Sequence, residues 1–163
     1  MGPSPDWYSA EIQEHSGYLI KSLYNLCGKE LVPVELLAKD PEAATKALFF
    51  ADRVILSHGL QQDPNGPILN YGNSKALERW KATWEQLTTM PSRFTAEMME
   101  RQAREEFMQT VLRNGMIDDY SGVRIGLDKS RFRIKNAIVW NVVIEGVLLG
   151  QAATFANWEE LDS

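Results

Sequence analysis

Cysteine is scarce in this sequence: Cys27 is the single one among 163 residues, so no disulfide can form within the chain. Secreted domains of this size are often stabilised by disulfides, and their absence favours a reducing compartment. The first residues, from Met1 to Asp6, lack the basic and apolar segments of a signal peptide. We therefore expect a cytoplasmic protein, and we interpret Cys27 as a small buried hydrophobe.

Long hydrophobic runs and excess positive charge are also missing. No apolar run approaches the roughly 20 residues that a membrane-spanning helix needs. The formal net charge is −5, whereas nucleic-acid-binding proteins and proteins of anionic membrane surfaces normally carry a basic patch. We therefore expect neither a nucleic-acid nor a membrane partner. The basic run over residues 131–135 is interpreted as the solvated side of a strand, with nucleic-acid contact as the alternative.

Metal ligands and catalytic groups are few. The chain has two histidines and one cysteine, without close spacing between them, so we predict no metal site. Ser57, His58 and Asp63 could suggest a hydrolase, but a catalytic triad depends on placement in space, and no nucleophile-elbow glycine pattern surrounds Ser57. We predict no catalytic residue and no enzymatic activity, and we interpret His58 as hydrogen-bonded at the end of a strand.

The sequence does have the residues of a real core. Hydrophobic residues make up 44% of it, with five tryptophans and six phenylalanines, which is enough for one ordinary domain. Apolar spacing predicts a first helix over residues 6–27, ended by Gly28, and Asp40 and Pro41 predict the start of a short second one. Short strands are expected at 54–56 and 68–71, followed by a helix from Ser74 that continues to about Leu87 and a longer helix over 95–113.

The last third is predicted to be β-structure, with strands at 123–127, 131–144 and 147–155. The middle strand alternates, and this places one set of side chains on a single face: Phe132, Ile134, Asn136, Ile138, Trp140, Val142 and Ile144. Its second half is apolar on both faces, so we expect both faces to be covered. The middle helices can cover one face, and the N-terminal helix is the obvious cover for the other.

The element order predicts an α+β fold with a five-stranded antiparallel sheet, helices packed on one face and an N-terminal amphipathic helix. We expect one structural unit, in which residues 1–40 form the N-terminal helix and linker and residues 41–163 form the sheet domain.

Several stretches of the sequence occur in the same order in a known family. They are Ile55–Gly59, Asn70–Asn73, Pro91–Glu97, Gly122–Ile125, Val139–Asn141 and Gly150–Ala153. On these the chain resembles the MEKHLA domain family, a PAS-related group that includes stand-alone proteins of photosynthetic bacteria and the C-terminal region of plant class III homeodomain-leucine-zipper proteins. The strand at 68–71 followed by Asn73 and a short helix is similar to a PAS pattern, as is the order of two strands, a helical middle and a three-strand meander.

The resemblance implies a PAS-like module that senses, binds a small ligand or binds a partner, and it names no ligand or cofactor. A haem sensor of this kind would need an axial ligand on the helical side of the pocket, which neither His15 nor His58 provides. A flavin-adduct light sensor would need a cysteine on the central helix, whereas Cys27 precedes the PAS-like core. The homeodomain and zipper of the plant members are absent.

We predict a pocket between the sheet and the middle helices, lined by apolar side chains with a few polar ones. Buried amides need hydrogen-bond partners, which a ligand, the backbone or water could supply, and Arg93 could pair with an acid or an anionic ligand. The predicted ligand-binding residues are Leu56, His58, Asn70, Trp80, Arg93, Phe107, Asn136, Trp140 and Gln151.

Two other functions stay open. The chain could be a dimerisation or docking module with a filled core, or, as a third alternative, a small hydrolase or isomerase that uses His58. We also predict a homodimer formed through the outer sheet face and the first helix. The predicted interface residues are Tyr8, Ile12, Leu19, Leu23, Val139 and Val143.

Overall fold

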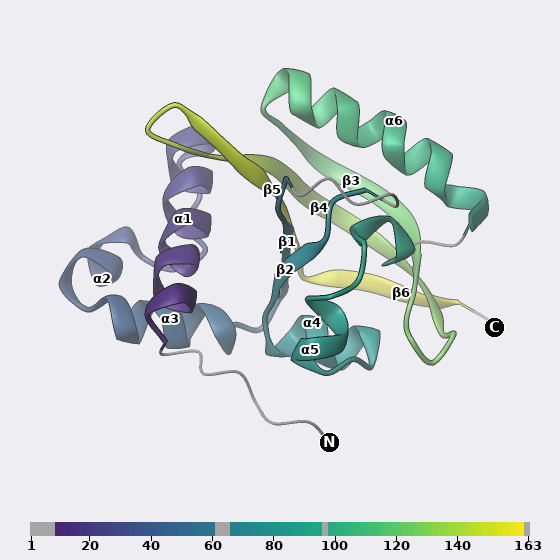
Figure 1. Cartoon of the computed structure of the whole chain (residues 1–163), viewed down its shortest axis with the longest axis horizontal. Helices are drawn as coiled ribbons and strands as arrows, with labels where there is room; N and C mark the ends of the chain where they lie inside the picture. Colours follow the sequence, from purple (N-terminus) through teal and green to yellow (C-terminus); the bar gives the residue numbers. More distant parts are fainter. Residues whose placement is uncertain (1–8, 61–65, 96–97, 162–163) are drawn as a thin grey trace.

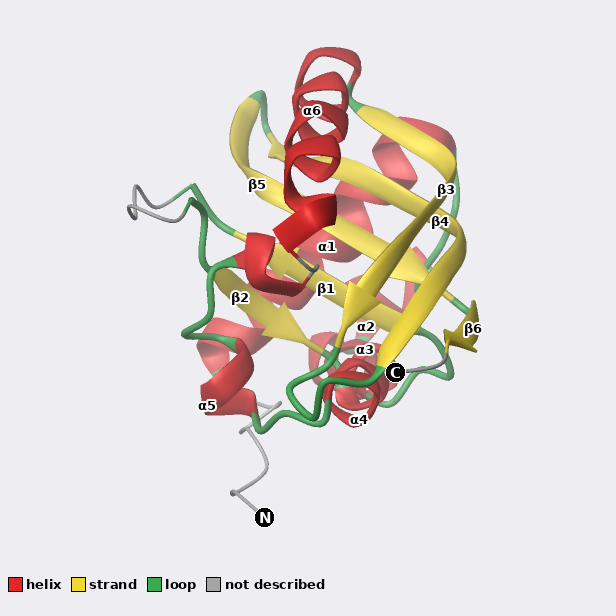
Figure 2. Ribbon diagram, turned by 90° about the vertical axis from the view of Figure 1, so that its right-hand side faces the viewer, coloured by secondary structure: helices red, strands yellow, loops and turns green. Residues whose placement is uncertain are grey.

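The computed structural model describes residues 9–60, 66–95 and 98–161, with side chains for all of these except 98–105. Within these ranges, one antiparallel sheet lies between helices on both of its faces (Figures 1 and 2). The helices are α1 Ala10–Cys27, α2 Val34–Lys39, α3 Pro41–Phe49, α4 Ser74–Trp80, α5 Trp84–Leu87, the 3-10 turn η1 Ser92–Thr95 and α6 Met98–Asn114. The strands are β1 Val54–His58, β2 Leu69–Gly72, β3 Met116–Ile125, β4 Arg131–Ile144, β5 Val147–Phe155 and β6 Asn157–Leu161. The predicted α+β class is confirmed.

The sheet has the order β2-β1-β5-β4-β3, to which β6 is added beside β4. The prediction of five strands did not include β6. This strand continues β5 beyond Ala156 in the same register, because Thr154 of β5 pairs with Ile138 and Asn157 of β6 pairs with Lys135. Residues 131–135 of β4 therefore pair with β6, and residues 138–144 pair with β5.

The face assignment along β4 was wrong, and a β-bulge is the reason. Asn136 has a φ of 54°, and it stands with Lys135 opposite a single residue of β3, because Tyr120 pairs with Ala137 and Gly122 with Ile134. An extra residue of this kind moves every following side chain to the other face. Asn and Asp tolerate positive φ better than most residues. A second register shift lies between Ile117 and Tyr120 of β3, where Asp119 has a φ of 60°.

The bulge divides the apolar residues of β4 between two cores. Phe132 and Ile134 before it, with Ala137 after it, join the core that contains α4 and α5. Trp140 and Val142 join the other core, beneath α1 and α3. The strand is thus apolar on both faces, and both faces are covered, as predicted. The residues that follow the bulge lie on the face opposite to the one predicted for them.

Helix α1 of the same chain covers the second face of the sheet. Leu19 is 0% and Leu23 1% exposed, and the indole Nε1 of Trp140 donates to Ser22 Oγ over 2.9 Å. Of the predicted dimer residues, these two leucines and Val139 are buried inside the chain, while Ile12 and Val143 are half-buried and Tyr8 lies outside the described residues. A second copy therefore has little of the predicted surface left to cover.

The helix ends follow the sequence closely. Gly28 ends α1 with a φ of 75°, and the Asp40 side chain accepts from Ala43 N at the start of α3. The predicted single helix from Ser74 to Leu87 is two helices, because Lys81 adopts a φ of 56° and Thr83 starts α5 with a capping box. Cys27, expected to be buried, is exposed at the end of α1, and α2 was not predicted.

Asn73, at the junction of β2 and α4, is fully buried. Its Oδ1 accepts from Ile55 N and Ala76 N, both over 3.1 Å. Its Nδ2 donates to Arg53 O over 2.8 Å and to Leu48 O over 3.3 Å. One side chain thereby caps α4 and joins β1 to the segment that follows α3.

Candidate functional site

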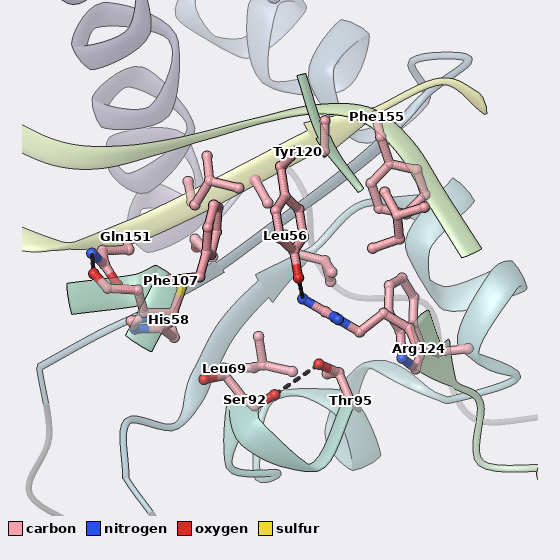
Figure 3. A pocket seen from close by; sticks show the side chains of 18 residues that line it. Leu56, His58, Leu69, Ser92, Thr95, Phe107, Tyr120, Arg124, Gln151 and Phe155 are labelled. Atoms are coloured by element: carbon pink, nitrogen blue, oxygen red, sulfur yellow. Dashed lines mark hydrogen bonds between the residues drawn. The ribbon is translucent and has the colours of Figure 1, made fainter. Parts of the chain in front are cut away.

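A small cavity lies on the face of the sheet opposite α1, beneath α4, η1 and the C-terminal half of α6 (Figure 3). Its volume is about 50 Å³. A buried water needs roughly 10–15 Å³ measured in this way, so the space suits a few waters or one very small molecule. The lining residues are Leu56, Ser57, His58, Leu69, Trp80, Ser92, Thr95, Phe107, Met108, Tyr120, Arg124, Ile134, Ala137, Val139, Gln151, Ala152, Ala153 and Phe155.

Five of the predicted ligand-binding residues meet at this cavity: Leu56, His58, Trp80, Phe107 and Gln151. Four others lie elsewhere. Trp140 and Asn70 make their contacts on the α1 side of the sheet, Asn136 is exposed on the bulge, and Arg93 lies half-buried in η1 without lining the cavity.

Gln151 on β5 connects the cavity wall to α6. Its Nε2 donates to Met108 O over 3.2 Å and to Asn141 Oδ1 over 3.1 Å. The Asn141 Nδ2 in turn donates to Leu112 O over 3.1 Å, which satisfies one of the carbonyls that a helix C-terminus leaves without an internal partner. Two side-chain amides of the sheet thus hold two turns of α6. The buried amide of Gln151 therefore has two hydrogen-bond partners, which are a backbone carbonyl and a second side-chain amide.

Two residues that the sequence prediction missed form the polar wall of the cavity. Arg124 is 7% exposed, its Nη1 donates to Val123 O and its Nη2 to the Tyr120 hydroxyl, each over 2.8 Å. Figure 3 shows the guanidinium and the hydroxyl pointing toward one another between Leu56 and Ser92. The lack of a side chain at Gly122, between them on β3, leaves the space that the Tyr120 hydroxyl and the guanidinium occupy.

Tyr120 also connects the cavity to α6. The rings of Tyr120 and Phe107 are stacked, with centroids 3.9 Å apart and planes 27° from parallel. An alternating strand with an arginine is normally interpreted as solvated on the arginine's side, which is why these residues were not predicted. The sequence does contain one indication of them: Tyr120, Gly122 and Arg124 alternate along one strand face, and the glycine between the two large side chains leaves room for them to meet.

The family pattern of the MEKHLA domain matches residues 13–160. The chain belongs to the MEKHLA domain family. The match includes most of α1 as well as the sheet, so it extends further toward the N-terminus than the motifs quoted above. No curated protein matches this MEKHLA chain in sequence.

Solved structures similar to the MEKHLA chain are PAS and Light-Oxygen-Voltage domains. The PAS domain of a Colwellia psychrerythraea protein has a TM-score of 0.61 at 12% identity, covering 74% of this chain and 95% of that one. A Light-Oxygen-Voltage domain studied with a flavin analogue has a TM-score of 0.56 at 14% identity, covering 74% and 85%. The PAS domain of a LuxR-family regulator from Burkholderia thailandensis, in complex with ethanol, has a TM-score of 0.52 at 11% identity, covering 71% and 95%. At these identities the likeness shows the fold alone, which is PAS-like.

Ser57 and His58 of this MEKHLA chain do not form a catalytic pair. Because they are neighbours on β1, their side chains point to opposite faces of the sheet. The His58 ring Nδ1 lies 3.0 Å from Gly59 O, while Ser57 Oγ donates to Asn70 Oδ1 over 2.5 Å on the α1 side. Asp63, the third residue of the hydrolase alternative, lies outside the described residues.

The other histidine, His15 on α1, contacts Ser57 instead, with Nε2 2.8 Å from Oγ. Ser57 gives its only hydroxyl proton to Asn70, so His15 Nε2 must be the donor in this contact. A nitrogen that carries a proton cannot take one from Ser57. Burial lowers the pKa of His15 from its ordinary 6.5 to about 4, which keeps the ring neutral in this hydrogen-bonded chain.

Within the described residues, no cluster of three or more His, Cys, Asp or Glu side chains could hold a metal ion. Among the described helices, none combines the length and the apolar character that a membrane-spanning segment requires.

Proposed function

We propose that this MEKHLA chain is a sensory domain that binds a small molecule in the cavity and responds through a shift of α6, without catalysing a reaction. The observation that carries the proposal is the cavity itself, which lies between the sheet and α6, with Phe107 and Met108 of α6 in its wall. PAS-like membership supports a sensory role but names no ligand.

The size of the cavity sets the size of the ligand. A volume of about 50 Å³ is far below the roughly 300–1,000 Å³ of pockets for drug-sized ligands. The ethanol in the Burkholderia thailandensis PAS domain has three non-hydrogen atoms, and a molecule of that order fits here. Apolar walls from Leu56, Ile134 and Phe155 suit a short aliphatic part, and polar groups at the Tyr120 end suit a polar head.

A flavin does not fit this site. The isoalloxazine ring system is much larger than the cavity, and Cys27 is exposed at the end of α1 and is not among the lining residues. The chain therefore lacks, at this cavity, the thiol of a flavin-adduct sensor.

The route from the cavity to the surface is α6. Phe107 and Met108 of α6 line the cavity, and Phe107 stacks on Tyr120. The same helix is joined to the sheet through Gln151 and Asn141. A ligand that enters the cavity contacts Phe107 and Met108, so the position of α6 depends on whether the cavity is filled.

Protein-observed NMR titration with ethanol tests the binding step. We expect the largest shift changes at cavity residues such as Ala137 and Ala153, and none at Ala44 in the α1-side core. Replacing Ala137, 1% exposed, with Leu should fill the cavity and abolish the changes. The control is Ala47→Leu on the exposed side of α3. Binding that is unaffected by Ala137→Leu would place the site elsewhere and refute the proposal.

Self-association is the second candidate function. Four large apolar side chains at one end of the molecule are at least a third exposed: Leu26 41%, Leu112 43%, Val147 57% and Leu149 36%. They come from the ends of α1 and α6 and from the β4–β5 hairpin, which lie at the upper side of Figure 1. Exposed apolar side chains that gather at one end of a molecule can mark a protein interface, so we propose a homodimer through this end rather than through the outer sheet face.

Analytical ultracentrifugation at micromolar concentration tests the dimer. The expected result is a dimer that Val147→Asp with Leu26→Asp converts to a monomer, while Phe50→Asp, at a 55% exposed site outside this end, leaves it intact. A wild-type monomer would refute this second candidate and leave the first untouched.

A further inference from the structure

We propose that the ligand of the cavity is a small aliphatic monocarboxylate, anchored by Arg124 and Tyr120. This inference rests on the proposed function and names the chemical class of its ligand. It follows from the buried guanidinium of Arg124, which has no counter-charge among the described residues.

Among the described residues that line the cavity, Arg124 is the only Arg or Lys, and none is an Asp or Glu. Its guanidinium donates to a backbone carbonyl and to a tyrosine hydroxyl, both neutral. Within the described part of the chain, no carboxylate lies within ion-pair distance of it. Charged side chains are almost never this buried unless they are paired, so the site lacks an anion.

The other arginine that is buried to this extent among the described residues, Arg79, differs. Arg79 is 6% exposed and has Glu160 at 2.9 Å. Half-buried Arg53 donates to the hydroxyl of Thr154 over 2.6 Å. Of the two buried guanidinium groups, the one outside the cavity therefore has a carboxylate partner, and Arg124, at the cavity, has none among the described residues.

The hydrogen-bond directions leave donors available to a ligand. The Tyr120 oxygen accepts from Arg124 Nη2, so its own proton is free to be donated. The guanidinium has five N–H groups, of which two are used in the contacts given above. Donors from Arg124 and Tyr120 thus converge at one end of a cavity whose other walls are mainly apolar.

These features together select a carboxylate with a short aliphatic tail. A planar guanidinium fork matches the two oxygens of a carboxylate, and the tail meets Leu56, Ile134 and Phe155. The volume limits the molecule to about three to five non-hydrogen atoms, as in formate, acetate or propionate. With so few atoms, even ideal binding has a Kd of no less than about 3 × 10⁻⁶ M.

The test compares acetate with acetamide, its neutral analogue of the same shape, by NMR titration at constant ionic strength held with chloride. We expect acetate to bind at least tenfold more tightly than acetamide. Arg124→Gln should reduce acetate binding to the level of acetamide, and Tyr120→Phe should weaken it severalfold. Arg133→Gln removes a charge of the same sign from the surface and should change nothing.

The possible failures are distinguishable. Equal binding of acetate and acetamide, or of acetate to wild type and Arg124→Gln, would overturn the carboxylate assignment, while binding of acetamide or ethanol would leave the proposed function standing. If acetate, acetamide and ethanol all leave the cavity resonances unchanged, both proposals are wrong. A folded Arg124→Lys variant gives a second reading: it keeps the charge but loses the fork, and we expect it to bind acetate more weakly than wild type.

Discussion

Replacing Asn73 with Ala should be among the most damaging single changes in this domain. The amide of Asn73 is the partner of Ile55 N, Ala76 N and Arg53 O, and it is one of several partners of Leu48 O. Loss of the α4 cap costs about 1 kcal/mol. Leaving the buried Ile55 N–H without a partner costs about 1–3 kcal/mol, and the Arg53 carbonyl adds about 1 kcal/mol.

The sum is a loss of about 3–5 kcal/mol in the free energy of unfolding, which is a large part of the roughly 5–15 kcal/mol of a typical domain. Urea unfolding followed by tryptophan fluorescence measures it. Asn73→Asp should be nearly as damaging, because it places a second oxygen against the Leu48 and Arg53 carbonyls. Asn25→Ala, at an exposed position of α1, is the matched control and should stay within about 0.5 kcal/mol. An Asn73→Ala variant within 1 kcal/mol of wild type would refute this reasoning.

Three further changes test the surrounding structure. The pKa of His15 is lowered from 6.5 to about 4, which means that the folded state disfavours the charged ring. The free energy of unfolding should therefore be highest above pH 6.5 and fall by up to about 3 kcal/mol as the pH drops to 4. His15→Gln should reduce this pH dependence when it is measured by urea unfolding, and equal slopes in both proteins would contradict the prediction. Gly122→Ala should displace the Tyr120 hydroxyl, cost about 1–3 kcal/mol and, by NMR, weaken acetate binding; unchanged affinity would argue against the Tyr120 contact. Arg79→Ala should cost about 2–4 kcal/mol, because the guanidinium is buried over the Phe132 ring at 3.7 Å, whereas Glu160→Gln, at a side chain 62% exposed, should cost less than about 1 kcal/mol; a larger loss for Glu160→Gln would show that the ion pair dominates.

Much of the fold could be predicted from the sequence because local rules decide it. Gly28 and Asp40 act as helix ends for reasons contained in their own chemistry, and the turn at Glu145 and Gly146 uses positive φ at both residues. The motifs spread between Ile55 and Ala153 led to the family, which the match over residues 13–160 confirms. The order of the helices and strands then followed from short connections.

The face of β4 could not be predicted from alternation, because one bulge reverses it. A pattern of period two assumes an unbroken ladder, and nothing local at Asn136 marks the extra residue except a side chain that tolerates positive φ. Because of this wrong face assignment, Trp140 and Asn136 were predicted to line the pocket and Val139 was predicted to lie on the outer face. Positions before the bulge, such as Phe132, were assigned to the correct core.

The polar wall of the cavity was missed for a different reason. Arg124 belongs to a strand whose alternation predicts a solvated arginine, and only the tertiary fold places α6 and η1 over that side. Gln151 was predicted because an amide among apolar neighbours is conspicuous, but its partner Met108 O is a backbone atom that no sequence pattern indicates. Burial by a distant element is the information that a single sequence lacks.

Hydrogen–deuterium exchange with and without saturating acetate tests most directly whether filling the cavity changes the hold of the sheet on α6. We predict slower exchange of the amides at 106–114 in α6 and at 92–95 in η1, with no change at 16–23 in α1, and no effect in Ala137→Leu. Exchange in α6 that is the same with and without acetate, although acetate binds, or a uniform slowing along the whole chain, would contradict this prediction.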